Sequence, residues 1–147
     1  MRLEPLYRAT FTTPESWGVD IEGERGTESL HFLIAEGRVS GALAGRLRGA
    51  NYARGLVDGT LLPDFRGVLE TDDGATVLYS WRGHTQLAID GVRRLSGSIT
   101  HQSDDARYQR LNNVVCVLTG EVRARAVGPG AEVALDVAEL VWEPADT

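Results

Sequence analysis

Lysine is absent from this chain of 147 residues, so every one of its 15 basic residues is arginine. This absence excludes Schiff-base and lysine-nucleophile chemistry, unless the N-terminal amine serves instead. Cysteine occurs only once, at Cys116, so no disulfide can form within the chain. Because Cys116 lies in the apolar run 114–118, we interpret it as a buried, inert thiol rather than a reactive nucleophile.

The chain also lacks a basic surplus and long apolar runs. Its net charge is −6 and its pI is near 5.0, which argues against a broad nucleic-acid-binding surface. No window approaches the roughly 20 apolar residues that span a bilayer. Residues 1–11 have no apolar signal-peptide region. We therefore expect a cytoplasmic protein without nucleic-acid or membrane partners.

The common cofactor and nucleophile motifs are missing. We find no Walker A sequence, no Gly-x-Gly-x-x-Gly opening a helix and no Gly-x-Ser-x-Gly elbow. The three histidines, His31, His84 and His101, have none of the spacings of a zinc site. We accordingly expect neither a metal nor another cofactor.

What recurs along the chain is short apolar or alternating segments separated by glycine. Helical periodicity is not sustained, and residues 104–112 favour at most a short helical turn. Evenly spaced strands with turn signals indicate a sandwich or barrel, and 17 glycines suit the bent strands of a small barrel. We predict one all-β domain over residues 1–147, a closed or nearly closed antiparallel β-barrel of about 8–9 strands. The expected strand segments are 3–13, 29–36, 38–47, 64–70, 75–81, 92–101, 113–125 and 132–142.

Residues 64–83 give the clearest hairpin. Asp73-Gly74 tolerates the positive φ angles of a tight turn between the two strands. On the first strand Asp64 and Arg66 share one face. Facing solvent, they form a surface ion pair that contributes ~0–1 kcal/mol. Facing a barrel interior, they form a buried charged pair of the kind that a ligand or a reaction requires. Periodicity alone leaves both readings open.

Other polar and aromatic residues are candidates with ordinary alternatives. Asn112, at the start of an apolar strand, either forms a turn or projects into a cavity. The three tryptophans read more simply as core or rim residues than as a ligand cage. His101 falls on the same strand face as Leu95 and Ile99.

Taken together, these stretches resemble the bacterial family known as domain of unknown function 3237. The most specific segments are Gly49-Ala50-Asn51-Tyr52, Asp58-Gly59, Asp64-x-Arg66 and Thr71-Asp72-Asp73-Gly74, followed by Tyr108-x-x-Leu111-Asn112 and Thr119-Gly120-Glu121. The resemblance implies a small β-barrel and favours an interior position for Asp64 and Arg66. Asn51 and Tyr52 stand where the family usually has Asp and Trp.

These features lead to a functional hypothesis. We expect a cofactor-independent enzyme that accepts a small, partly apolar organic molecule inside the barrel and catalyses hydration or dehydration, isomerisation or ring closure. Asp64 would be the general acid/base and Arg66 would hold a carboxylate or enolate. The substrate-binding candidates are Asn51, Tyr52, Tyr108, Asn112, Trp81 and His101.

Two rival classes remain. One is a non-catalytic barrel that carries or senses small apolar compounds. The other is a structural module whose interior is filled by side chains. A homodimer is also plausible, because an exposed apolar strand or the edge beside the final strand could bury against a second copy.

Overall fold

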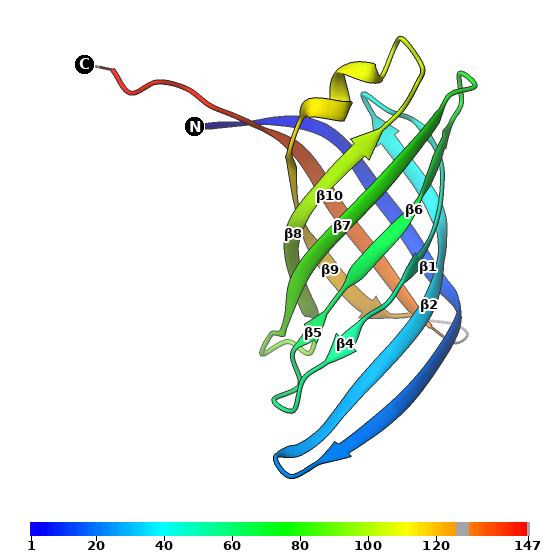
Figure 1. Cartoon of the computed structure of the whole chain (residues 1–147), viewed down its shortest axis with the longest axis vertical. Coiled ribbons are helices and arrows are strands. Elements are labelled where there is room, and N and C mark those ends of the chain that lie inside the picture. Colours follow the sequence, from blue (N-terminus) through cyan, green and yellow to red (C-terminus); the bar gives the residue numbers. More distant parts are fainter. Residues whose placement is uncertain (126–129, 147) are drawn as a thin grey trace.

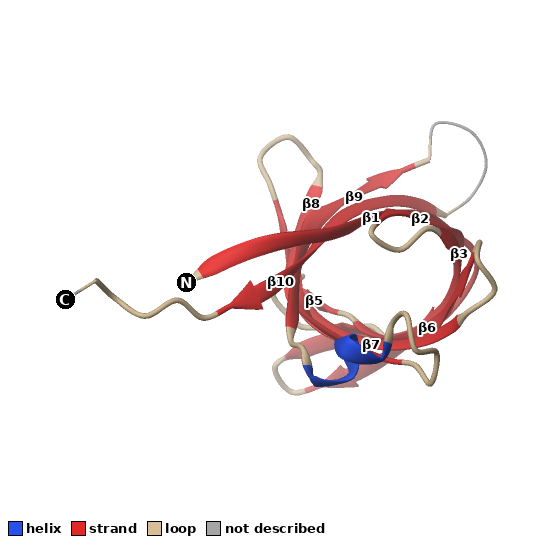
Figure 2. Ribbon diagram, turned by 90° about the horizontal axis from the view of Figure 1, so that it is seen from above, coloured by secondary structure: helices blue, strands red, loops and turns tan. Residues whose placement is uncertain are grey.

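The computed structural model describes residues 1–125 and 130–146, which form an antiparallel β-barrel (Figure 1). The described residues contain ten strands, of which β4 and β5 have two residues each. The other eight close a ring in which each strand pairs with its neighbours, β1-β2-β3-β6-β7-β8-β9-β10 and back to β1 (Figure 2). The predicted antiparallel β-barrel is therefore confirmed. The strands are β1 (Arg2–Gly23), β2 (Gly26–Gly41), β3 (Gly45–Asn51), β4 (Arg54–Gly55), β5 (Leu61–Leu62), β6 (Asp64–Thr71), β7 (Thr76–Leu87), β8 (Arg93–Gln102), β9 (Cys116–Ala124) and β10 (Ala131–Val141).

Six of the eight predicted strand segments each fall on one strand, apart from single end residues. The exceptions are segment 38–47 and segment 113–125, whose first three residues precede β9. Segment 38–47 spans the turn between β2 and β3, where residues 42–44 leave the sheet. The predicted helical turn is a 3₁₀ helix, η1 (Gln109–Asn113), at the barrel end where both termini lie (Figure 1). The turn expected at residues 128–130 falls largely outside the described residues. No helix in the described part of the chain is long and apolar enough to cross a membrane.

The hairpin joining β6 and β7 forms where its sequence predicts it, although only Gly74 of the Asp73-Gly74 pair has a positive φ angle. Gly74 adopts a φ of 93°, and its N–H donates to the Thr71 carbonyl at 3.0 Å. The Thr71 hydroxyl also accepts the Ala75 N–H at 2.8 Å. This turn fixes the pairing register, which places Phe65 opposite Trp81 and Leu69 opposite Val77.

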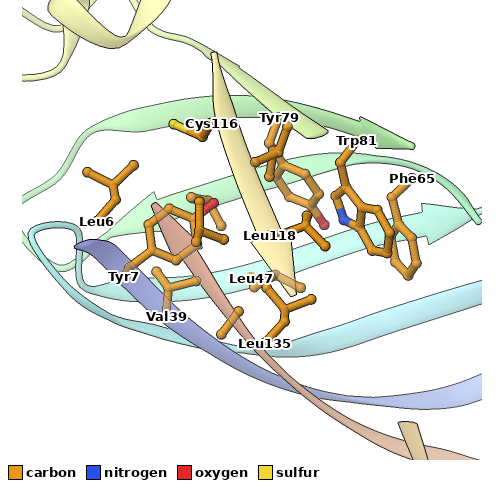
Figure 3. Packing of buried hydrophobic residues seen from close by; sticks show 14 of the residues in the cluster. Leu6, Tyr7, Val39, Leu47, Phe65, Tyr79, Trp81, Cys116, Leu118 and Leu135 are labelled. Atoms are coloured by element: carbon orange, nitrogen blue, oxygen red, sulfur yellow. The ribbon is translucent and has the colours of Figure 1, made fainter. Parts of the chain in front are cut away.

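Alternate residues of each strand point into the barrel and form its core. On β7 the inward residues Val77, Tyr79 and Trp81 are at most 5% exposed, whereas their neighbours face solvent. Tyr79 lies over Gly67 of the adjacent strand β6 and donates a hydrogen bond to the Arg48 carbonyl of β3 at 3.2 Å. A Cβ at Gly49 or Gly67 would lie within 2.4 Å of the Tyr79 hydroxyl oxygen, so these two glycines make room for the ring. Figure 3 shows the packed side chains.

The β1–β2 hairpin extends past the ring. β1 pairs with β10 only as far as Thr12, but its pairing with β2 continues to Gly23. A bulge between Thr12 and Glu15 redirects the strand at this point. The hairpin therefore projects beyond the barrel at the end opposite η1 (Figure 1).

Candidate functional site

A cavity of about 280 Å³ lies inside the barrel at the end from which the β1–β2 hairpin projects. Small-molecule sites typically have volumes of about 300–1,000 Å³, so this cavity suits a compact ligand of one or two rings. Most of its lining is apolar. The apolar residues are Phe11, Leu33, Ala53, Leu61, Pro63, Phe65, Trp81, Leu95, Val122, Ala131 and Val133, and the polar ones are Thr13, His31, Asn51, Thr85 and Arg93.

One wall of the cavity is aromatic. Phe65 of β6 and Trp81 of β7 stack with their ring centroids 4.5 Å apart and their planes 9° from parallel (Figure 3). Phe11 of β1 meets Phe65 edge to face, with a centroid distance of 5.6 Å. Flat aromatic faces offer a planar ligand both apolar area and a defined stacking orientation.

His31 is the only histidine among the described residues that line the cavity. It projects inward from β2, is partly exposed, and its Nε2 lies 2.9 Å from the Ser29 hydroxyl. The packing around this pair is tight. A Cβ at Gly18 would lie 3.0 Å from His31 Nδ1, and a Cβ at Gly55 would lie 2.2 Å from Ser29 Oγ. The Ser29 hydroxyl and the two glycines thus hold the imidazole at the cavity wall.

Arg93 and Asn51 supply further hydrogen-bond donors, Arg93 from β8 across the ring from His31 and Asn51 from β3, which pairs with β2. Arg93, on β8, donates from Nη1 to the Gly59 carbonyl at 3.1 Å, and no carboxylate of the described residues pairs with it. Asn51, at the end of β3, accepts the Asp64 N–H at its Oδ1, at 3.0 Å. This bond fixes the side chain and leaves its Nδ2 without an acceptor among the described residues.

The two lining threonines have a structural role. Thr85 Oγ1 donates to the Leu61 carbonyl at 2.9 Å and accepts the Leu61 N–H at 3.2 Å, which ties β5 to β7. Thr13 Oγ1 accepts the Ala131 N–H at 3.0 Å. Because these hydroxyls already take part in hydrogen bonds between strands, the described groups that are best placed to bind a ligand are those of His31, Asn51 and Arg93.

The other end of the barrel is filled. His101 is 1% exposed, and its Nε2 lies 2.7 Å from the Tyr7 hydroxyl. Burial lowers the pKa of His101 to about 4, so the ring is neutral at pH 7. Burial also raises the pKa of Tyr7 well above its usual value. Leu111 of η1 is buried over this end and joins the same core. His101 is thus interior, as its alternation indicates, but it lies outside the cavity.

The expectation that Asp64 and Arg66 face the interior is wrong. On β6 the inward positions are Phe65, Gly67 and Leu69, so the even-numbered residues project outward. Arg66 is exposed, and Asp64 lies 3.5 Å from Arg82 Nε on the outer wall. The family resemblance does not determine which residues of β6 point into the barrel. The alternation of residues along the strand is equally compatible with the even-numbered or the odd-numbered residues pointing inward.

Three further candidates also lie away from the cavity. Tyr52 is 61% exposed and packs against Phe32 on the outer surface. Tyr108 donates to Asp73 Oδ2 at 2.6 Å near the other end of the barrel. Asn112 braces a loop by bonding to both the N–H and the carbonyl of Ser103, at 2.8 and 2.9 Å. Of the residues expected to bind substrate, the cavity brings together only Asn51 and Trp81.

His31 and Arg93 were not among the sequence candidates, although a signal for each was present. Arg93 is odd-numbered like Leu95, Ile99 and His101, so it lies on the same face of β8 as these inward residues. Continuing the alternation two residues before Leu95 would have identified it. His31 lies two residues before Leu33 in a nearly continuous apolar run, which hides the alternation. No group of three His, Cys, Asp or Glu residues in the described ranges could hold a metal ion.

The fold and cavity define a small closed antiparallel barrel with a ligand-sized pocket at one end. Residues 1–140 match the family described as protein of unknown function (DUF3237), and the chain belongs to that family. The resemblance noted from its motifs is thereby confirmed. A comparison with curated proteins found no match.

Several solved structures share the fold. A β-barrel-like protein from Acinetobacter baumannii AYE is 21% identical, with a TM-score of 0.74 and 94% of each chain covered. A protein of unknown function from Clostridium acetobutylicum is 18% identical, with a TM-score of 0.78, and the match covers 96% of this chain and 100% of that one. A structure described as an enzyme from Penicillium herquei is 21% identical, with a TM-score of 0.63 and coverage of 92% and 93%. At these identities the likeness concerns the fold.

Proposed function

We propose that the cavity is the active site of a cofactor-independent enzyme that transfers a proton on a small, partly apolar molecule bearing an acidic or carbonyl oxygen. The observation that carries this proposal is the convergence of His31 and Arg93, from strands β2 and β8, on one largely apolar cavity. Sites of this composition bind organic ligands, with a few polar groups setting the orientation. The Penicillium herquei structure supports the proposal only in that one barrel of this fold is described as an enzyme.

The roles follow from the chemistry of each side chain. His31 would act as the general base that removes a proton beside a carbonyl or from a hydroxyl, because an imidazole nitrogen at the cavity wall can accept a proton from a bound molecule. Arg93, which has no carboxylate partner among the described residues, would bind the carboxylate or the oxygen on which charge develops. Asn51 Nδ2 would donate a further hydrogen bond, and the Phe65–Trp81 wall would hold the apolar part.

This set of groups fits water addition or elimination, isomerisation and ring closure. Each of these reactions moves protons to or from carbon and oxygen and stabilises a transient oxyanion. The proposal replaces Asp64 and Arg66, which lie on the outer wall, with His31 and Arg93.

A non-catalytic carrier is the second candidate. Of the sixteen described residues that line the cavity, eleven are apolar, and two of the five polar ones hold strands together. A barrel that only stores or senses an apolar compound needs no more than this.

Proton abstraction can be tested without knowing the product. Wild-type protein is incubated in D₂O with small aromatic and alicyclic keto and hydroxy acids, and deuterium incorporation is followed by NMR. We expect exchange that His31→Gln reduces at least 100-fold, while His84→Gln, at an exposed histidine on the outer wall, leaves it unchanged. Binding without exchange in the wild type would identify a carrier. Full exchange in His31→Gln would remove the assigned base.

A further inference from the structure

The β1–β2 hairpin carries an apolar face that no element formed by the described residues covers. Beyond Thr12, no described strand other than β2 pairs with β1, so the hairpin leaves the barrel with one open edge (Figure 1). Its inward face continues the cavity wall through His31 and Leu33. Its opposite face is apolar. We name that face the hairpin stripe, and its exposed members are Trp17, Val19, Ile21, Leu30 and Tyr52, with the partly buried Phe32 at its centre.

The residues of the hairpin stripe form a continuous surface. Trp17, Val19 and Ile21 alternate along β1, with Phe32 opposite Trp17 and Leu30 opposite Val19. Phe32 contacts both aromatic neighbours, with ring centroids 5.8 Å from Trp17 and 5.0 Å from Tyr52. The ordered ring contacts give the stripe a fixed shape.

The exposure of these side chains is large for surface hydrophobic residues. Trp17, Val19 and Ile21 are 56%, 58% and 52% exposed, and Leu30 and Tyr52 are 46% and 61% exposed. Since large aromatic side chains offer ~150–250 Å² each, the stripe exposes on the order of 500 Å². This is near the upper end of the patches that monomeric proteins display, which are about 300–600 Å².

A second copy of the same chain fits this surface. Two such stripes facing each other would bury on the order of 1,000 Å², which is about the smallest total area of a specific interface. Glu28, which lies opposite Ile21 at the edge of the stripe, does not oppose this contact, because its carboxylate is already paired with Arg54 at 2.8 Å. A membrane surface is a poorer occupant, because interfacial membrane helices and anchors rely on basic residues and this chain has a net charge of −6.

We propose that the protein is a two-fold homodimer in which the hairpin stripes of two copies pack face to face. The contact is isologous, so each stripe serves as both surfaces of the interface. The inward faces of the hairpins, and with them both cavities, stay outside the contact.

Analytical ultracentrifugation and multi-angle light scattering of the full chain test this proposal. The wild type should have a mass of about 32 kDa, twice the 16.0 kDa of one chain. Val19→Glu and Ile21→Glu should raise the dimer dissociation constant at least 100-fold. The matched control is Leu78→Glu, at an equally exposed apolar residue of β7 away from the stripe, which should remain dimeric.

The stripe residues are exposed in the single chain, so these variants should fold, and circular dichroism with a thermal melt checks this. If either variant is unfolded, Trp17→Ser replaces it. A wild-type mass of 16 kDa at every concentration tested would overturn the proposal. It would do so even if the stripe of the monomer were found to bind another protein or lipid vesicles. Stripe variants that dimerise as tightly as Leu78→Glu would overturn it as well.

Discussion

The Tyr7 hydroxyl and His101 Nε2 lie 2.7 Å apart in the filled part of the barrel interior. Around this pair, leucine, valine and cysteine side chains pack to near-complete burial. The cavity walled by Phe65 and Trp81 lies further along the barrel, toward its other end. The same fold thus provides stability at one end and a binding site at the other.

The buried neutral His101 makes stability depend on pH. Its pKa is about 4 in the folded chain and near 6.5 when unfolded, so between these values the unfolded state binds more protons. Stability should therefore fall as the pH drops from about 6.5 to 4, by up to roughly 3 kcal/mol. Urea unfolding at several pH values measures this. His101→Gln, which cannot titrate, should show a shallower fall, and equal slopes would contradict the account.

Gly120 should not tolerate a side chain. A Cβ there would lie 2.1 Å from the Ala134 carbonyl oxygen and 2.6 Å from Leu135 Cα, both of which belong to backbone that cannot easily move. Gly120→Ala should lower the free energy of unfolding by about 1–3 kcal/mol or more. Gly23→Ala is the control, because its nearest contact would be at 3.7 Å. Similar unfolding midpoints for the two variants would disprove the steric argument.

Cys116 should be unreactive in the folded protein. The residue is fully buried, and burial, with Glu139 nearby, raises the pKa of its thiol to about 11. We expect 5,5′-dithiobis(2-nitrobenzoate) to react with less than a tenth of the thiol in native protein and with all of it in guanidinium chloride. Rapid stoichiometric reaction of the native protein would show that the thiol is accessible.

Filling the cavity should block it without unfolding the barrel. Ala53 is 5% exposed and lines the cavity, so the ring of Ala53→Phe would occupy the space meant for a ligand. Binding of an aromatic acid such as 1-naphthoate, followed by calorimetry, should be lost, while the melting temperature should change by no more than a few degrees. Ligand affinity equal to that of the wild type would place the binding site elsewhere.

Alternation and turn chemistry were enough to predict the barrel. Val77, Tyr79 and Trp81 alternate with Leu78 and Ser80 on the outer face, and the turn before them lies at Asp73-Gly74, so the β6–β7 hairpin follows from local rules. The resemblance through the Thr-Asp-Asp-Gly segment agreed with this reading and is confirmed by the family match.

The site was harder to predict because it depends on strand facing and pairing. Asp64 and Arg66 were placed inside, but the inward face of β6 includes Gly67, whose missing side chain weakens the apolar signal there. His31 and Arg93 are 62 positions apart in the sequence and meet only because β2 and β8 lie on the same ring. No local pattern carries that information, whereas Asn51 and Trp81 were found through a motif and through alternation.

The most direct test of the central claim is calorimetric titration of 1-naphthoate into wild type, Arg93→Met and Arg94→Met. Arg94 adjoins Arg93 but faces outward and pairs with Asp90 and Glu121, each at 2.9 Å. If the cavity binds small aromatic anions, Arg93→Met should weaken affinity at least tenfold, about 1.4 kcal/mol, and Arg94→Met should match the wild type. No binding to the wild type, or equal affinities for both variants, would contradict the account.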